Sequence, residues 1–175
     1  TDTPVRNYAV LGGAVNGANG NPYNGNLQIN TNNYSAAATL SITSGKYYFE
    51  ETIGPASPDY GNAIGVVIGN SSYVYGAFNG NTGGSVYAAG SGLTPYGEVF
   101  NSGDLIGVAV DRDNNSLTFY KSGVSQGIAT TTLPAGDMLP YVNDYSGAST
   151  TATLNFGQQP FVASNVTHDQ AKGIA

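Results

Sequence analysis

Residues 103–123 read GDLIGVAVDRDNNSLTFYKSG, and this stretch decides the fold of the chain. Its first half is apolar on both faces of an extended strand. The members of the two faces are Ile106, Val108 and Val110 on one side, and Leu105, Gly107 and Ala109 on the other. A strand of this kind is expected at the centre of a sheet, with other parts of the protein covering both of its faces.

A turn and a second strand follow in the same stretch. Residues 111–115, DRDNN, are of types that bond their own main chain and tolerate left-handed backbone, which predicts a turn. Beyond it, Leu117 and Phe119 alternate with polar residues, as in a strand with one buried face. Ser122 and Gly123 predict a second tight turn. The whole stretch therefore predicts an antiparallel hairpin.

Three further segments complete a family pattern. They are GKYYFE (45–50), IGVVIG (64–69) and LNFGQQPF (154–161). Together with the hairpin, and in this order, they resemble the motifs of SPRY (B30.2-like) domains over residues 26–161. Phe49 stands where the family often has Trp, and Ser122 where Asn is usual. Neither change affects the fold that the resemblance implies, a concanavalin-like jelly roll.

The residues themselves also predict an all-β, two-sheet antiparallel β-sandwich. Strand patterns recur about every 8–12 residues between Gly, Asn and Pro, and no stretch has a helical period. We expect a core that contains Ile106, Val108, Val110, Leu117, Phe119, Leu154 and Phe156. The expected organisation is an N-terminal arm with a Gly/Asn-rich loop (1–25), the sandwich (26–161) and a polar tail (162–175).

The composition excludes several classes of protein. The chain of 175 residues has a net charge of −6 and only five basic residues, so no phosphate-binding groove is expected and no nucleic-acid partner is predicted. It has no cysteine, which excludes disulfides and thiolate metal sites. No stretch approaches the ~20 apolar residues of a membrane span, so no membrane insertion is predicted.

Catalytic groups are scarce. The single histidine, His168, lies in the polar tail. Glu50 and Glu51 are adjacent in a predicted strand, so they point to opposite faces and cannot act as a general acid and base pair. We expect them to be paired or hydrogen-bonded carboxylates at the rim. The sequence therefore predicts a protein that is not an enzyme, with no catalytic residues and no cofactor.

A metal site is not predicted either. Residues 111–115 place oxygen ligands at alternate positions, like the start of a calcium loop. However, Ser116 and Ser122 stand where such a loop has Gly at its sixth position and Glu at its twelfth. We expect this segment to close a hairpin through its own main chain.

Aromatic rings among small polar residues predict a binding surface. The expected ligand-binding residues are Tyr60, Tyr73, Tyr75, Phe78, Asn79 and Tyr145. The glycines at positions 76, 80, 83 and 84 break any regular strand, which predicts that the segment from Tyr73 to Asn79 loops outward. Antibody paratopes use the same mixture, because a Tyr ring supplies contact area with few rotatable bonds. SPRY domains resemble one another in binding ligands through loops at one edge of the sandwich. The alternative is that most of these rings fill the edge of the core.

The function first expected rests on residues 1–11, TDTPVRNYAVL, which resemble the lead-in of SPRY modules in phage tail and virion proteins. This predicts a bacteriophage tail-fibre, head-fibre or capsid decoration module, extracellular at the virion surface, that contacts a host glycan or surface protein. The arm and the tail would attach it to other virion subunits. The alternatives are a purely structural capsid or tail component that docks on neighbouring subunits, and an intracellular SPRY adaptor that recognises a peptide.

Overall fold

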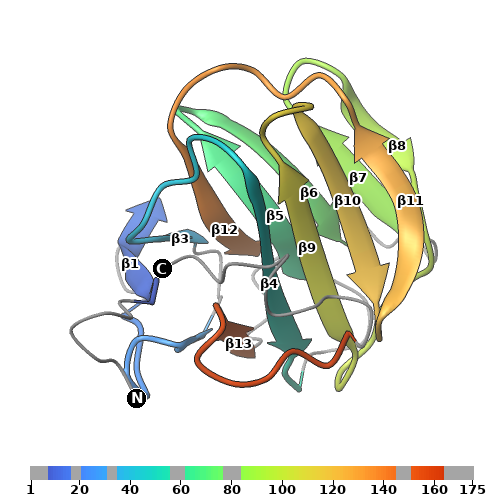
Figure 1. The fold of residues 1–175 in the computed structure, drawn as a ribbon. Helices are drawn as coiled ribbons and strands as arrows, with labels where there is room; N and C mark the ends of the chain where they lie inside the picture. The colour runs from blue at the N-terminus through green and yellow to red at the C-terminus, as the bar shows by residue number, and fades with distance from the viewer. Residues whose placement is uncertain are drawn as a thin grey trace.

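The computed structural model describes residues 8–16, 21–30, 35–55, 62–76, 84–144 and 151–163, which form a sandwich of two antiparallel sheets (Figure 1). The β9 sheet has the order β11 (Val124–Thr130), β10 (Ser116–Lys121), β9 (Leu105–Asp111), β4 (Lys46–Ile53), β13 (Thr151–Asn155), β2 (Gln28–Asn30). The β5 sheet has the order β1 (Leu11–Asn16), β3 (Ser35–Ala38), β12 (Met138–Asp144), β5 (Asn62–Ile68), β6 (Ser71–Gly76), β7 (Ser85–Ala88), β8 (Gly92–Pro95). The described residues contain no helix, and therefore none that could cross a membrane. The predicted fold class is confirmed.

The predicted hairpin lies at the centre of its sheet. β9 pairs with β10 on one side, where Val108 is opposite Phe119, and with β4 on the other, where Val108 is opposite Phe49. The expected core is confirmed, because each of its members is at most 3% exposed: Ile106, Val108, Val110, Leu117, Phe119, Leu154 and Phe156. These side chains fill the space between the two sheets.

Both predicted turns have the backbone that their residues suggested. One carboxylate oxygen of Asp111 accepts hydrogen bonds from the backbone N–H groups of Asp113 and Asn114, each at 3.1 Å. Asn115 then takes a left-handed φ of 50°. In the second turn Ser122 and Gly123 have φ angles of 47° and 82°, the combination of a tight hairpin. In the first turn the Asp111 side chain therefore bonds the main chain of its own segment, as these residue types predicted.

The outer face of β9 is also covered. Tyr48 packs edge-on against Phe161, with ring centroids 5.0 Å apart, and against Tyr120 at 6.0 Å. A Cβ on Gly107 would collide with the hydroxyl of Tyr48, so only glycine leaves room for this ring. Ala163 is 2% exposed within the same cluster. The packed part of the chain thus includes Ala163.

The position of Phe119 gives the first prediction. We expect Phe119→Ala to lower the free energy of unfolding by about 3–5 kcal/mol, because it empties a fully buried site between the sheets. Urea denaturation measures this. Ile128→Ala is the control, because this side chain is 65% exposed on the edge strand and should change stability little. Equal, small effects of the two substitutions would contradict the placement of Phe119.

Candidate functional site

The strand register brings several chain connections to one end of the sandwich. In the β5 sheet, Asn62 is opposite Asp144, and Gly76 is opposite both Ala63 and Ser85. β5 and β7 therefore begin, and β6 and β12 end, at the same level. The sequence segments 56–61, 77–83 and 145–150 all join strands there.

Strands of the β9 sheet end at the same level. The N–H of Gly54, just after β4, donates to the carbonyl of Thr151, where β13 begins. The N–H of Ser122, just after β10, donates to the carbonyl of Leu105, where β9 begins. We call this end of the molecule, lower in Figure 1, the loop end. It is where the family resemblance led us to expect a ligand site.

Four of the six expected binding residues belong to the sequence segments that join strands at the loop end. They are Tyr60, Phe78, Asn79 and Tyr145, and all four lie outside the described residues. Their role stays a prediction.

The other two expected binding residues, Tyr73 and Tyr75, are placed on β6 and not on an outward loop. Tyr75 is completely buried, with its ring centroid 5.3 Å from that of Phe119, and Tyr73 packs partly buried against the same core. The expected loop was wrong at these positions because β6 continues to Gly76, and its alternation turns both rings inward. Both rings therefore pack in or against the core of the sandwich.

A fixed segment beside the loop end was not predicted from the sequence. The Tyr75 hydroxyl donates to the carbonyl of Glu98, and burial raises the pKa of Tyr75, so this hydroxyl stays a donor. The Lys121 ammonium donates to the carbonyl of Val99 at 2.8 Å and forms ion pairs with Asp104 and Glu98. These contacts tie the chain between β8 and β9 to the sandwich.

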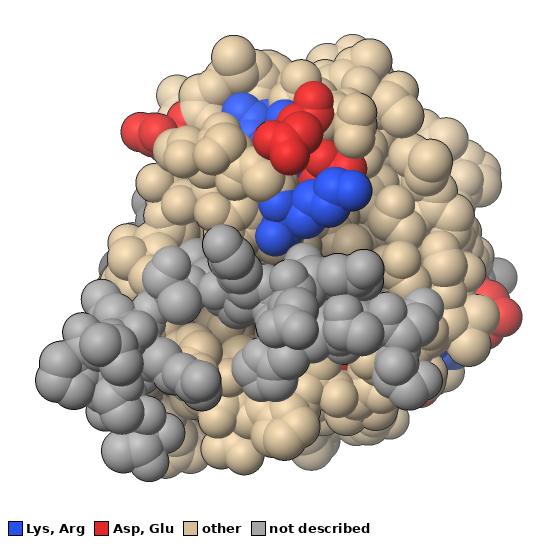
Figure 2. Space-filling view, viewed as in Figure 1, with Lys and Arg blue, Asp and Glu red and all other residues tan. Residues whose placement is uncertain are grey.

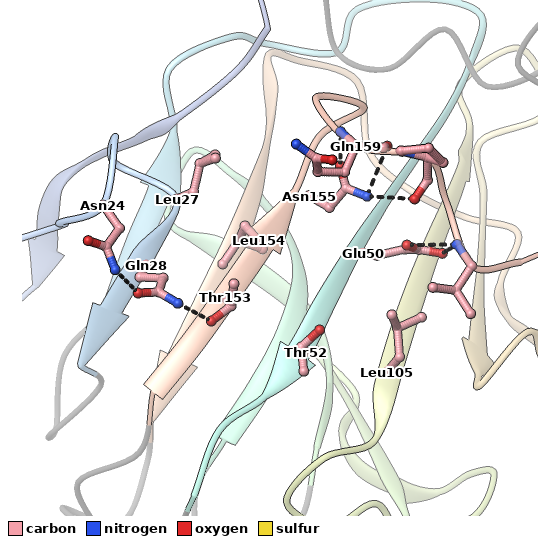
Figure 3. A pocket seen from close by; sticks show the side chains of 12 residues that line it. Asn24, Leu27, Gln28, Glu50, Thr52, Leu105, Thr153, Leu154, Asn155 and Gln159 are labelled. Carbon is pink, nitrogen blue, oxygen red and sulfur yellow. Dashed lines mark hydrogen bonds between the residues drawn. The ribbon is translucent and has the colours of Figure 1, made fainter. Parts of the chain in front are cut away.

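A second surface is a hollow of about 400 Å³ on the outer face of the β9 sheet (Figure 3). Its polar wall comes from β2 and β13, where the amide of Gln28 donates to the hydroxyl of Thr153 at 2.9 Å. Thr52 and Leu105 line it from β4 and β9. Among the described residues that line it, Glu50 is the one with a charged side chain.

Glu50 fixes the last described part of the chain, residues 160–163, which we call the C-terminal strap. Its carboxylate accepts hydrogen bonds from the backbone N–H groups of Val162 at 3.0 Å and Ala163 at 3.2 Å, and from the Tyr48 hydroxyl at 3.1 Å. Burial and the Glu50 carboxylate raise the pKa of Tyr48, which keeps its proton. The expected rim position is wrong for Glu50, which is 1% exposed, because the strap covers it.

The expected rim position is also wrong for Glu51, which lies on the other face of β4. It is 0% exposed between the sheets, where the amide of Asn62 donates to it at 2.9 Å. Adjacent residues of a strand do point to opposite faces, as the sequence predicted. Both faces are covered, however, so neither carboxylate lies at the rim. Alternation alone cannot tell a covered face from a solvated one.

Charged side chains on the face shown in Figure 2 gather mainly toward the end that carries the β9–β10 turn, opposite the loop end. At that end Lys46 pairs with Asp111 at 3.4 Å. The buried Arg112 guanidinium donates to the carbonyls of Pro134 and Gly136 and holds the turn against the chain between β11 and β12. The described residues contain no cluster of His, Asp or Glu that could hold a metal ion.

Comparison with known proteins identifies the family. The model of the SPRY domain matches residues 17–159. The chain belongs to the SPRY domain family. The SPRY domain of human HERC1 superimposes with a TM-score of 0.63 at 18% identity, over 77% of this chain and 91% of that one, which shows the shared fold. The jelly-roll sandwich implied by the four motifs is confirmed.

Two curated relatives are more similar in sequence to this chain than the SPRY domain of HERC1 is. Ran-binding protein 10 of Danio rerio is 33% identical over 174 residues, which cover 91% of this chain and 28% of that protein. Human Ran-binding protein 9 is 35% identical over 136 residues, which cover 73% of this chain and 18% of that protein. The chain therefore spans less than a third of the length of these relatives.

These relatives correct the expected function. They are proteins of animals, so the prediction of a bacteriophage tail-fibre, head-fibre or capsid decoration module is wrong. Three predictions that depended on it are wrong for the same reason. They are the extracellular virion location, the attachment to virion subunits through residues 1–11 and 162–175, and the host glycan or surface protein as ligand. The cue was a short pattern in residues 1–11, and a short pattern cannot separate branches of a family whose shared motifs lie in the sandwich.

The strap gives the second prediction. We expect Glu50→Ala to lower the free energy of unfolding by on the order of 3 kcal/mol and to speed hydrogen exchange at Val162 and Ala163, because two N–H groups and the Tyr48 hydroxyl lose their acceptor. Amide exchange followed by NMR measures the local effect. Thr52→Ala is the control, since Thr52 is exposed on the same face of β4. Unchanged exchange at both amides in the Glu50 variant would contradict the strap.

Proposed function

We propose that this chain is the protein-binding module of an intracellular adaptor, and that its loop end takes a short segment of a partner protein. The module has no catalytic role in this proposal. The observation that carries it is the 33–35% identity to Ran-binding proteins 9 and 10, whose names describe binding to a partner, Ran. This is the adaptor alternative drawn from the sequence.

The geometry of the loop end supports this location. Tyr60, Phe78, Asn79 and Tyr145 belong to sequence segments that join strands at this end, and aromatic and amide side chains bind protein surfaces with little loss of rotamer entropy. Most charged side chains visible in Figure 2 lie toward the opposite end, and beside the loop end Lys121 is paired with Asp104 and Glu98. Contacts of this kind depend on stacking and neutral hydrogen bonds, so affinity should vary little with salt.

The adjacent glutamates support a structural use of the carboxylates. Glu50 accepts bonds from the strap, and Glu51 is bonded to Asn62 between the sheets. Each is at most 1% exposed, and the two face different layers. A general acid and base pair needs two carboxylates that reach one substrate, so this arrangement supports structural roles for Glu50 and Glu51.

The partner itself belongs to this proposal. Ran is the first candidate to test, because the names of the relatives state that they bind it. This chain spans only 28% of Ran-binding protein 10 of Danio rerio, so the contact with Ran can belong to another part of that protein. A peptide library displayed against the purified chain covers partners other than Ran.

The third prediction tests the loop end. We expect the triple variant Tyr60→Ala, Phe78→Ala, Tyr145→Ala to bind Ran, or the peptides selected on the unchanged chain, at least tenfold more weakly. The matched control is Thr131→Ala with Asp137→Ala, two exposed residues at the opposite end. Calorimetric titration measures affinity, and a thermal melt checks folding.

Three outcomes contradict the proposal. One is equal binding by the triple variant and the unchanged chain. Another is loss of binding in the control. The third is the absence of any binder among Ran and the selected peptides.

A further inference from the structure

A pair of buried side chains joins the two sheets beneath the loop end. Glu51 points inward from β4 of the β9 sheet, and Asn62 is the first residue of β5 in the β5 sheet. They are 0% and 4% exposed. The amide nitrogen Nδ2 of Asn62 donates to Oε1 of Glu51 at 2.9 Å.

Each partner has one oxygen left over. Oε2 of Glu51 and Oδ1 of Asn62 are both buried, and neither has a hydrogen-bond partner among the described residues. If Glu51 is ionised, both atoms can only accept, so they cannot satisfy each other. A buried polar atom without a partner costs about 1–3 kcal/mol, and more for a charged group. Two such atoms on one bonded pair therefore need an explanation.

The described neighbours of Glu51 include no cation that could stabilise a charge. The residues opposite Glu51 in the sheet are Ile106 on β9 and Leu154 on β13, both apolar and buried. Ile64, the next inward residue of β5, is also buried and apolar. An ionised carboxylate in such a place is strongly disfavoured.

Few other charged groups lie near these strands in the described part of the chain. Glu50 lies on the opposite face of β4 and is bonded to the strap. Lys121, at the loop end, pairs with Asp104 and Glu98. Asp144 ends β12 opposite Asn62 in the register. Asp144 is itself an acid, so this position in the sequence supplies no positive charge.

We infer that Glu51 is a neutral carboxylic acid in the folded chain, whose Oε2–H donates to Oδ1 of Asn62, and that ionisation of this acid destabilises the sandwich and loosens the start of β5. The two partners then exchange two hydrogen bonds, and all four polar groups are satisfied. Each sheet holds one half of the pair. The inference concerns the fold and does not rest on the proposed function.

The direction of the pH effect follows from the burial. The pKa of Glu51 is raised from 4.5 to about 8, mainly by burial. The hydrogen bond from Asn62 lowers the pKa by a smaller amount than burial raises it. Between these values the folded chain holds a proton that the unfolded chain has released. The contribution of Glu51 to the free energy of unfolding is therefore complete below about pH 4.5, falls as the pH rises, and is lost once the pH passes about 8.

The fourth prediction compares the unchanged chain with Glu51→Gln. The glutamine amide can donate to Oδ1 of Asn62 without a titratable proton, so both hydrogen bonds survive at every pH. Urea denaturation between pH 5 and 8 should show stability falling with pH in the unchanged chain and nearly constant stability in the variant. Both proteins are compared in a chain that also carries His168→Gln. This substitution removes the histidine, the other side chain expected to titrate in that range.

Two further measurements make the test decisive. The side-chain carboxyl carbon of Glu51, followed by NMR in the full chain, should titrate above pH 7, and this holds even if the glutamine variant does not fold. Asp144→Asn should keep the pH dependence of stability. A Glu51 titration near pH 4, or a pH dependence that disappears with Asp144→Asn and not with Glu51→Gln, would overturn the inference.

Discussion

The structure depends on the double cover of β9. Its inner face packs between the sheets through Ile106, Val108 and Val110. Its outer face is covered because Gly107 leaves room for the Tyr48 ring, against which Phe161 packs. Glu50 then fixes the strap by accepting hydrogen bonds from two of its backbone N–H groups. A strand that is apolar on both faces is stable at the centre of a sheet only if both covers are present.

This dependence explains which features could be read from the sequence. The hairpin, its turns and the core around Phe119 follow from local alternation and turn chemistry, and these predictions are confirmed. The burial of Glu50 arises from a strap that lies 112 positions away along the chain, and no local pattern encodes such a contact. The glycines that follow Tyr75 in the sequence favour a loop at this position. Pairing with both β5 and β7 keeps β6 regular to Gly76, and Tyr75 thereby enters the core.

The sequence predicted the SPRY family correctly but predicted the wrong branch of that family. Four motifs in order identified the SPRY fold, since each motif fits a buried strand or tight turn of the sandwich. The choice of the phage branch rested on residues 1–11, which carry little of that physical constraint, and the relatives overturned it. The ends of the sandwich divide the remaining roles. One ion pair and a buried arginine fix the turn end. The Lys121 ion pairs fix the chain beside the loop end, and the sequence segments that join strands there contain aromatic and amide residues.

The most direct test of the account is to map where a ligand contacts the folded chain. Backbone amide NMR spectra recorded during titration with Ran or a selected peptide would provide the map. The account predicts that the largest shifts occur at the loop end, at described residues such as Gly103, Ser122 and Thr151, while Asn114 and Ala135 at the opposite end stay unchanged. Shifts centred instead on the turn end, or on Thr52 in the hollow of the β9 sheet, would contradict it.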